Sequence, residues 1–280
     1  MIAERDREGV LDVFGSVQPP FDLIPVHGAE WFFNTAEAIV ILLVALYAVI
    51  RRQPLLLVIM LGTGVAGFVE PLDDTASRLW FTVHMSVPFT VYGRTWAIFF
   101  PLGYAIYYGL GSWAVYKVMD RGGSRKTLLM LAIAGGLFDT AVEYPWLSTR
   151  LYKYYGPQPF DILGFPLYWA FINTAYLFVV GYAFFLLRHW LKGTKALAGF
   201  FIPIVSIGMI YGLAWPTWIA MNVQGPPIAA MWIASAVTMA LSAVVIWLIS
   251  AAAARYGSPL RLQPKTSEIA DPAGVLTANR

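Results

Sequence analysis

Acidic residues end two of the most hydrophobic runs in this sequence. Glu70 and Asp73 lie three positions apart in GFVEPLDDTAS, and Asp139 and Glu143 lie four apart in GLFDTAVEYPW. On a helix, residues at either spacing share one face. Burial in apolar surroundings favours the protonated form of a carboxyl group, which can then donate a proton to a weakly basic substrate. These four carboxyl groups are therefore candidates for acid catalysis.

A less specific interpretation is that these acids cap helices and meet water at a membrane interface. It fits Asp73 and Asp74 best, because the run DDTASR is typical of a loop. Glu70, Asp139 and Glu143 each follow several apolar turns, where acids usually face a cavity or a partner. We therefore expect Asp73 and Asp74 to face water, while Asp73 stays a candidate through its spacing from Glu70.

Other polar residues are candidates to assist these acids. His84 lies among aromatic residues and is a candidate acid or base, although a lone histidine is more often structural. Asn34, Glu37 and Asn173 stand near the starts of two predicted helices. They either bind substrate or simply cap and bridge the helices.

Aromatic residues gather in the same parts of the chain as the acids. An interfacial aromatic belt explains many of them, since membrane proteins carry one in any case. The others are predicted to line a pocket in which ring faces stabilise a cationic intermediate. The candidate substrate-binding aromatics are Trp80, Tyr92, Tyr144, Trp146, Trp215 and Trp218.

The composition is that of an integral membrane protein. Of the 280 residues, 59% are hydrophobic and 12% charged, against about 25% charged in a soluble domain. The short alternating segments of a membrane barrel are absent, so the spans are helices. The absence of cysteine excludes thiol nucleophiles and thiolate metal sites. The net charge of +3 indicates membrane topology, and no nucleic-acid partner is expected.

Hydrophobicity predicts an all-α domain of seven transmembrane helices over 31–256. An extramembrane arm over 1–30 precedes it, and a flexible tail over 257–280 follows it. A segment near 74–94 is too polar to span and is predicted to be re-entrant or interfacial. The predicted spans are 31–51, 54–72, 95–119, 127–147, 165–190, 197–221 and 228–254.

Basic residues concentrate in alternate loops, which predicts the orientation. They follow the first, third, fifth and seventh spans at Arg51, Arg52, Lys117, Arg121, Arg125, Lys126, Arg188, Lys192, Lys195, Arg255 and Arg261. The positive-inside rule then puts the N-terminus outside and the C-terminus in the cytoplasm. The acidic helix ends fall on the non-cytoplasmic side.

An internal repeat is a further hypothesis. The stretches 31–52 and 169–190 both contain Asn-Thr-Ala and end in basic residues, which fits two three-helix units joined by a fourth helix. The Glu143-Tyr144-Pro145 end of the fourth span also fits a repeat of three hairpins. The last span has no lysine, which excludes a retinal Schiff base. Phosphate-binding glycine loops, HExxH and a DDxxD-type diphosphate motif are also absent.

The combination resembles the small seven-helix membrane-bound terpene cyclases. Glu70 in GFVEPLDD and Asp139 and Glu143 in FDTAVEYPW carry this resemblance, which covers roughly residues 30–255 without a signature string. It implies intramembrane acids that protonate an epoxide or an alkene. Carotenoid-modifying membrane proteins are loosely similar too.

We therefore expect an enzyme that protonates a hydrophobic, isoprenoid-type substrate and so starts cyclisation or isomerisation. It would need no metal or organic cofactor. It would lie in the inner or plasma membrane, or in the endoplasmic reticulum of a eukaryote, among membrane lipids. The alternative is a small carrier with the three-plus-one-plus-three layout of SWEET-type sugar carriers. A receptor or assembly subunit is a third interpretation, for which no residue argues.

Overall fold

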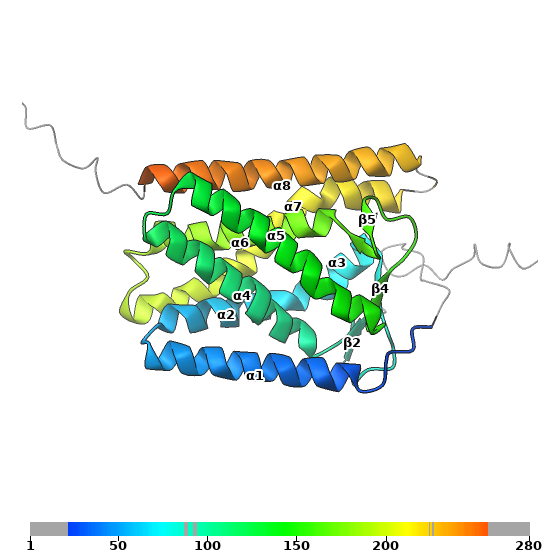
Figure 1. Cartoon of the computed structure of the whole chain (residues 1–280), viewed down its shortest axis with the longest axis horizontal. Helices are drawn as coiled ribbons and strands as arrows, with labels where there is room; N and C mark the ends of the chain where they lie inside the picture. Colours follow the sequence, from blue (N-terminus) through cyan, green and yellow to red (C-terminus); the bar gives the residue numbers. More distant parts are fainter. Residues whose placement is uncertain (1–21, 87–88, 92–93, 224, 226, 257–280) are drawn as a thin grey trace, which may run out of the picture.

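The computed structural model is a bundle of helices lying side by side along its long axis (Figure 1), and it describes residues 22–86, 89–91, 94–223, 225 and 227–256. Most of the predicted N-terminal arm and the whole predicted tail over 257–280 lie outside these residues. In chain order the helices are α1 (Ala29–Ile50), α2 (Pro54–Ala66), α3 (Glu70–Ser77), α4 (Phe99–Asp120), α5 (Arg125–Ser148), α6 (Tyr168–Leu187), α7 (Phe201–Asn222) and α8 (Ile228–Tyr256). The 3₁₀ segments Gly67–Val69 and Gly193–Phe200 lead into α3 and α7.

Six helical stretches are long and apolar enough to cross a membrane, which supports the predicted all-α membrane bundle. They are Ala29–Ile50, Pro54–Ser77, Arg125–Ser148, Tyr168–Leu187, Gly193–Asn222 and Ile228–Tyr256. The helix α4 is also 22 residues long but is not among the six, and it carries four tyrosines. The seventh crossing and the orientation therefore stay predictions.

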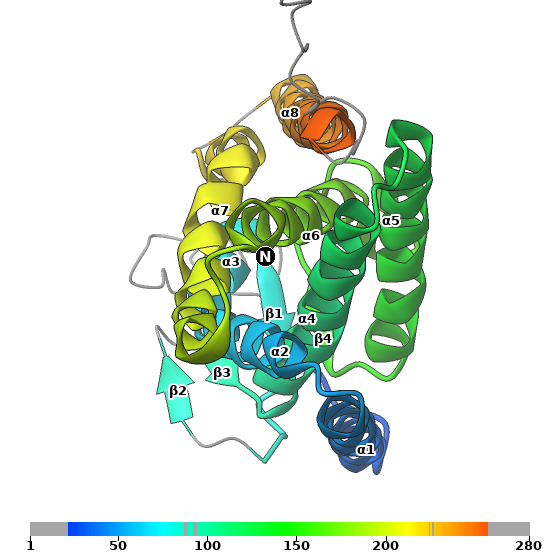
Figure 2. The same cartoon turned by 90° about the vertical axis from the view of Figure 1, so that its left-hand side faces the viewer.

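The helix α4 runs through the interior, between α2 and α6 (Figure 2). Glycines let the backbones approach closely there, as is usual in membrane bundles. A Cβ atom at Gly109 would lie 3.0 Å from Met60, and one at Gly181 would lie 2.8 Å from the carbonyl oxygen of Ser112. This central place explains how α4 tolerates a polar, tyrosine-rich sequence.

Short strands gather with α3 at one end of the bundle (Figure 1). They form three antiparallel pairs: β1 (Leu79–Phe81) with β4 (Tyr152–Tyr154), β2 (Phe89–Val91) with β3 (Arg94–Trp96), and β5 (Asp161–Ile162) with β6 (Phe165–Pro166). The segment predicted not to span, near 74–94, holds the end of α3, then β1 and β2. Two helices begin a few residues after their predicted starts, α4 at Phe99 and α6 at Tyr168, because the residues before them form strands.

The prediction that Asp73 and Asp74 face water is wrong. Both lie inside α3 and are only 3% and 1% exposed. The helix persists because Pro71 stands in its first turn, where proline is tolerated, and acids there suit the helix dipole. It ends at Arg78, whose φ of 59° is left-handed and whose N–H donates to the carbonyl oxygen of Asp74.

The two halves of the hypothetical repeat lie in different surroundings. In the most apolar window of α1 only 6% of the residues are buried inside the bundle, against 67% in the corresponding window of α6. The helix α1 lies at the edge of the bundle and α6 at its centre (Figure 2). A duplication of 31–52 as 169–190 stays a hypothesis.

Candidate active site

A cavity of about 330 Å³ lies among α1, α3, α4, α5 and α6, close to the strand end. The strands β1 and β4 close it on that side, since Phe81 pairs with Tyr152 and Leu79 pairs with Tyr154, and all four side chains line the cavity. One of the candidate acids, Glu143, is hydrogen-bonded to this two-stranded wall.

Five carboxyl side chains line this one cavity. Glu37 comes from α1, Glu70 and Asp73 from α3, and Asp139 and Glu143 from α5. The two acidic helix ends that the sequence singles out therefore face each other across the same space. Such convergence of ionisable groups on an apolar cavity is the usual mark of a functional site in a membrane bundle.

Tyrosine hydroxyls hold the two acids of α3. The hydroxyl of Tyr104 on α4 is hydrogen-bonded to Glu70 Oε2, and the hydroxyl of Tyr211 on α7 is hydrogen-bonded to Asp73 Oδ2. The two hydroxyl oxygens lie 3.1 Å apart. The four side chains thus form one hydrogen-bonded chain on the cavity wall.

A third acid and a buried cation stand behind this chain. Glu70, Asp73 and Asp74 each offer an oxygen within 4.8 Å of the others. The positive charge of Arg94 acts on Asp74 in this cluster. Arg94 is 1% exposed, and its guanidinium donates to the Thr75 hydroxyl, to the Leu79 carbonyl and to Tyr155.

An amide holds Asp139 from the opposite wall. Asn173 Nδ2 on α6 donates to both oxygens of Asp139, at 3.2 and 3.0 Å, while Asn173 Oδ1 accepts from the hydroxyl of Tyr108 at 2.7 Å. Asn173 is thus oriented by one helix and presents its N–H group to another. Since both oxygens of Asp139 accept, this arrangement suits the ionised carboxylate.

The second acid of α5, Glu143, is held by the strand wall. The hydroxyl of Tyr152 on β4 donates to Glu143 Oε2. Burial raises the pKa of Tyr152 well above its usual value, and the charge of the neighbouring Glu143 raises that pKa further. Tyr152 therefore keeps its proton and stays a donor. Burial likewise raises the pKa of Tyr154, which lines the same wall.

Aromatic rings make up much of the remaining wall. Trp146 on α5 stacks on Phe33 with ring centroids 3.9 Å apart and lies 4.6 Å from Phe99. Phe81 meets Phe100 edge to face at 4.3 Å. All of these except Phe33 line the cavity, so aromatic side chains as well as carboxyl groups meet whatever occupies it.

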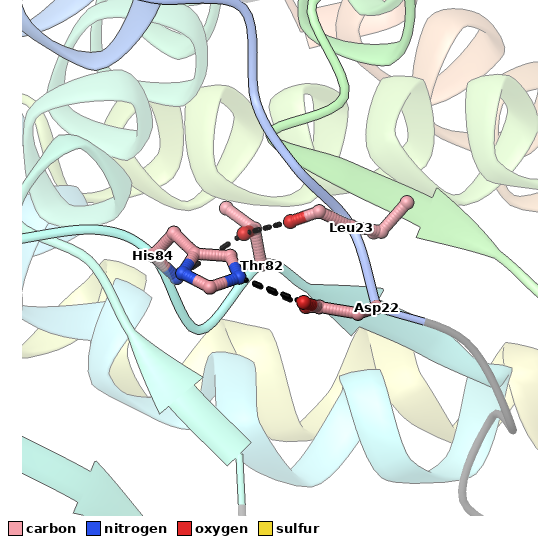
Figure 3. Close-up of polar contacts among 4 residues, drawn as sticks. All are labelled: Asp22, Leu23, Thr82 and His84. Carbon is pink, nitrogen blue, oxygen red and sulfur yellow. Dashed lines mark hydrogen bonds and ion pairs between the residues drawn. The ribbon is translucent and has the colours of Figure 1, made fainter.

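His84 is not part of this site. Its side chain is about half exposed and its Nε2 lies 2.9 Å from Asp22 Oδ2 (Figure 3). In the same view the Thr82 hydroxyl donates to the carbonyl oxygen of Leu23 and accepts from the backbone N–H of His84. These contacts fasten the segment before α1 to the loop after β1, which is a structural role.

Several predicted substrate-binding residues lie away from the cavity lining. The ring of Trp80 packs against the Arg94 guanidinium at 5.0 Å, and the hydroxyl of Tyr144 donates to the Ile162 carbonyl. Trp215 is 54% exposed, whereas Trp218 is buried beside Tyr211. Asn34 lies on α1, three residues before Glu37, and Tyr92 lies outside the described residues. Of the predicted set, the cavity brings together Glu37, Glu70, Asp73, Asp139, Glu143, Trp146 and Asn173.

The sequence prediction missed the tyrosines that hold the acids and their partners. Tyr104 and Tyr108 lie four residues apart in GYAIYYG, which places them on one face of α4. That spacing was the available signal. Tyr152 and Tyr211 gave none, because their partners are nine and 138 residues distant in the chain.

The fold and the site together define a helical bundle of membrane-spanning type with an internal cavity lined by acids and aromatic rings. Comparison with protein-family models, with curated proteins and with solved structures finds no match. The function must therefore be argued from the site itself.

Proposed function

We propose that this protein is an integral membrane enzyme that protonates a hydrophobic, isoprenoid-type substrate and so starts its cyclisation or isomerisation. The observation that supports this proposal is the convergence of five carboxyl side chains from three helices on one aromatic cavity. Carboxyl groups without a matching set of cations are most easily kept in apolar surroundings as acids. A protonated acid facing an apolar cavity can protonate an alkene or an epoxide.

Glu70 is the proposed proton donor. Tyr104 engages its Oε2, which leaves Oε1 for the cavity that Glu70 lines. Protonation breaks the O–H bond of Glu70 and uses the π electrons of an alkene, or opens the C–O bond of an epoxide. The carbocation that forms would meet the ring faces of Trp146, Phe99 and Phe81, which attract positive charge.

Asp139 is the proposed base. Asn173 donates to both of its oxygens, which stabilises the ionised form needed to accept a proton. When a C–H proton of the carbocation passes to Asp139, the electron pair of that C–H bond forms a C=C bond. Substrate and product are therefore isomers. Glu143 lies one helical turn from Asp139 and lines the same cavity, so it is the second candidate for this role.

We propose that α4 crosses the membrane in addition to the six apolar stretches, which makes seven spans. The N-terminus would then lie outside and the C-terminus in the cytoplasm. The cavity would then lie in the non-cytoplasmic half of the bilayer, and a lipophilic substrate would enter sideways from the lipid. The membrane would be the inner or plasma membrane, or the endoplasmic reticulum of a eukaryote.

The test is product formation by the purified protein. Prenyl alcohols, prenyl epoxides and carotenoid precursors are incubated with it in detergent or nanodiscs, and products are separated by mass and retention. We expect a new isomer that Glu70→Gln and Asp139→Asn abolish. Asp120→Asn is the matched control, because Asp120 ends α4 beside Lys117 and Arg188 and does not line the cavity. Full activity in both cavity variants would refute the acid mechanism.

The same preparation separates the enzyme from the carrier alternative. Protein in proteoliposomes is offered a radiolabelled solute, such as a sugar, and uptake is compared with that of empty vesicles. Uptake without any chemical change in the solute or in the prenyl substrates would favour the carrier and overturn the proposed reaction.

A further inference from the structure

Glu70 and Asp73 are joined through two tyrosine hydroxyls into a chain of four groups. In order along this chain the contacts are Glu70 Oε2 to the Tyr104 hydroxyl, the Tyr104 hydroxyl to the Tyr211 hydroxyl, and the Tyr211 hydroxyl to Asp73 Oδ2. The carboxyl groups come from α3 and the hydroxyls from α4 and α7. Three elements thus hold three consecutive contacts in hydrogen-bonding geometry.

When both Glu70 and Asp73 are ionised, this series of hydrogen bonds lacks one hydrogen atom. Three contacts need three hydrogens, and the two hydroxyls supply only two. If both tyrosines donate outward to carboxylates, the contact between Tyr104 and Tyr211 sets lone pairs against each other at 3.1 Å. Buried polar groups are nearly always hydrogen-bonded, and an unsatisfied contact there is expensive. The missing hydrogen has to come from a carboxyl group.

We propose that Glu70 and Asp73 share a single proton through Tyr104 and Tyr211. In one arrangement Glu70 is protonated and donates to Tyr104, Tyr104 donates to Tyr211, and Tyr211 donates to ionised Asp73. In the other arrangement every donor is reversed and Asp73 holds the proton. Each of the three shifts breaks one O–H bond and forms another, so one proton crosses the chain while all three contacts stay filled.

The charges around these residues argue against ionisation of both Glu70 and Asp73. The pair then carries one negative charge rather than two, and Asp74 is the third acid of the cluster. The buried guanidinium of Arg94 acts on Asp74 and supplies one positive charge. A single shared proton therefore leaves the cluster with less unbalanced charge than full ionisation would, which favours it in surroundings of low dielectric constant.

The shared proton gives Glu70, the proposed proton donor, a route by which it can be reprotonated from Asp73. A proton that reaches Asp73 moves to Glu70 by the three shifts, and rotation of the Glu70 carboxyl group then presents it to the cavity. Asp73 and Tyr211 become positioning residues for Glu70, although Tyr211 is not among the residues that line the cavity. This role rests on the proposed function, whereas the shared proton itself does not.

Infrared spectroscopy tests the shared proton without any substrate. The C=O band of protonated carboxyl groups, identified by its shift in heavy water, is integrated for wild type, Glu70→Gln, Asp73→Asn and the double variant. In Glu70→Gln the new amide N–H fills the first contact, and in Asp73→Asn it fills the last, so neither chain needs a carboxyl proton. We expect each single variant to lose the intensity of one carboxyl group and the double variant to lose no more.

Loss of two carboxyl groups in the double variant, or of none in either single variant, would overturn the proposal. Tyr176→Phe is the control, because Tyr176 is buried and donates to the Pro203 carbonyl outside the chain. It should keep the wild-type intensity. If an isomerase activity is found, Tyr211→Phe should lower its turnover at least tenfold while Tyr176→Phe leaves it unchanged. Equal activity in Tyr211→Phe would refute the relay but leave the acid mechanism standing.

Discussion

The side-chain amide of Asn173 on α6 donates to both carboxyl oxygens of Asp139 on α5, at 3.2 and 3.0 Å. Asp139 is 2% exposed and Asn173 is 7% exposed, so neither finds its partners in bulk water. The hydroxyl of Tyr108 fixes the other end of the amide at 2.7 Å. A carboxylate in this position depends on its donors, which makes the network a target for mutation.

Asn173→Ala is expected to lower the free energy of unfolding by about 1–3 kcal/mol, since Asp139 loses both donated bonds and stays buried. Thermal unfolding in detergent measures the change. The double variant with Tyr108→Phe should fall short of the sum of the single changes, because the two residues share one network. Asn34→Ala is the control: Asn34 Oδ1 has no hydrogen-bond partner in the described part of the chain, so its removal should change little. Equal losses in both variants would contradict this.

Trp146→Leu is expected to reduce turnover by roughly tenfold if a cation forms in the cavity. A ring face contributes on the order of 0.5–2 kcal/mol to holding a cation, and about 1.4 kcal/mol corresponds to a factor of ten in rate. The change is measured as turnover with the substrate that the product screen identifies. Trp215→Leu is the control, because Trp215 is 54% exposed. A similar loss in both variants would point to a general packing effect and not to cation stabilisation.

Gly181→Ala is expected to destabilise the bundle by about 1–3 kcal/mol through overpacking. Its Cβ would lie 2.8 Å from the backbone oxygen of Ser112, so α4 and α6 would have to separate. Gly208→Ala is the matched control in α7, where a Cβ meets no atom within 4 Å. The control should be neutral or stabilising by up to about 1 kcal/mol, because alanine favours helices. Detergent unfolding of both variants checks the contrast, and equal effects would contradict the close contact.

Tyr152 is expected to make stability fall with rising pH on the alkaline side. Burial, and then the Glu143 charge, raise the pKa of Tyr152, so above about pH 10 the unfolded chain releases a proton that the folded protein keeps. The folded state then binds more protons, and its stability falls with pH by up to about 1.4 kcal/mol per unit for this one group. The stabilisation is fully present below the ordinary pKa of tyrosine and is lost as the pH rises toward the raised value.

Tyr152→Phe removes that proton from both states. Its unfolding free energy should therefore depend less steeply on pH between about 10 and 11 than that of the wild type, whatever its stability at neutral pH. Melting temperatures in detergent across this range provide the comparison. Identical slopes in the two proteins would show that Tyr152 titrates normally.

Much of the fold follows from local chemistry that the sequence displays. Runs of apolar residues long enough to span a bilayer predict helices, and each of the seven predicted helices has a helical counterpart, although the predicted helix 54–72 is divided into α2, a 3₁₀ segment and α3. The errors lie at one end of the bundle. Short strands replace the predicted starts of α4 and α6. Strand pairing depends on the neighbouring segment in space more than on the residues themselves, so the local sequence does not predict it.

The candidate site was predictable only in part, and for a similar reason. The shared faces of Glu70 with Asp73, and of Asp139 with Glu143, follow from helical periodicity within one element. The run DDTASR misled, because its composition suits a loop while its place in the bundle keeps it helical and buried. His84 lies among aromatic residues in the chain, yet in space it pairs with Asp22.

From the residues alone it follows that this chain is a helical bundle of membrane-spanning type and that two of its helical stretches carry acids on one face. Those properties depend on hydrophobicity and on spacing of three or four residues. The packing of the helices in space is what brings both acidic faces to one cavity. It also places Tyr104, Tyr211, Asn173 and Tyr152 against the carboxyl groups. The rotation of each helix about its axis is fixed by packing, as at Gly109 and Gly181, and packing joins residues far apart in the chain.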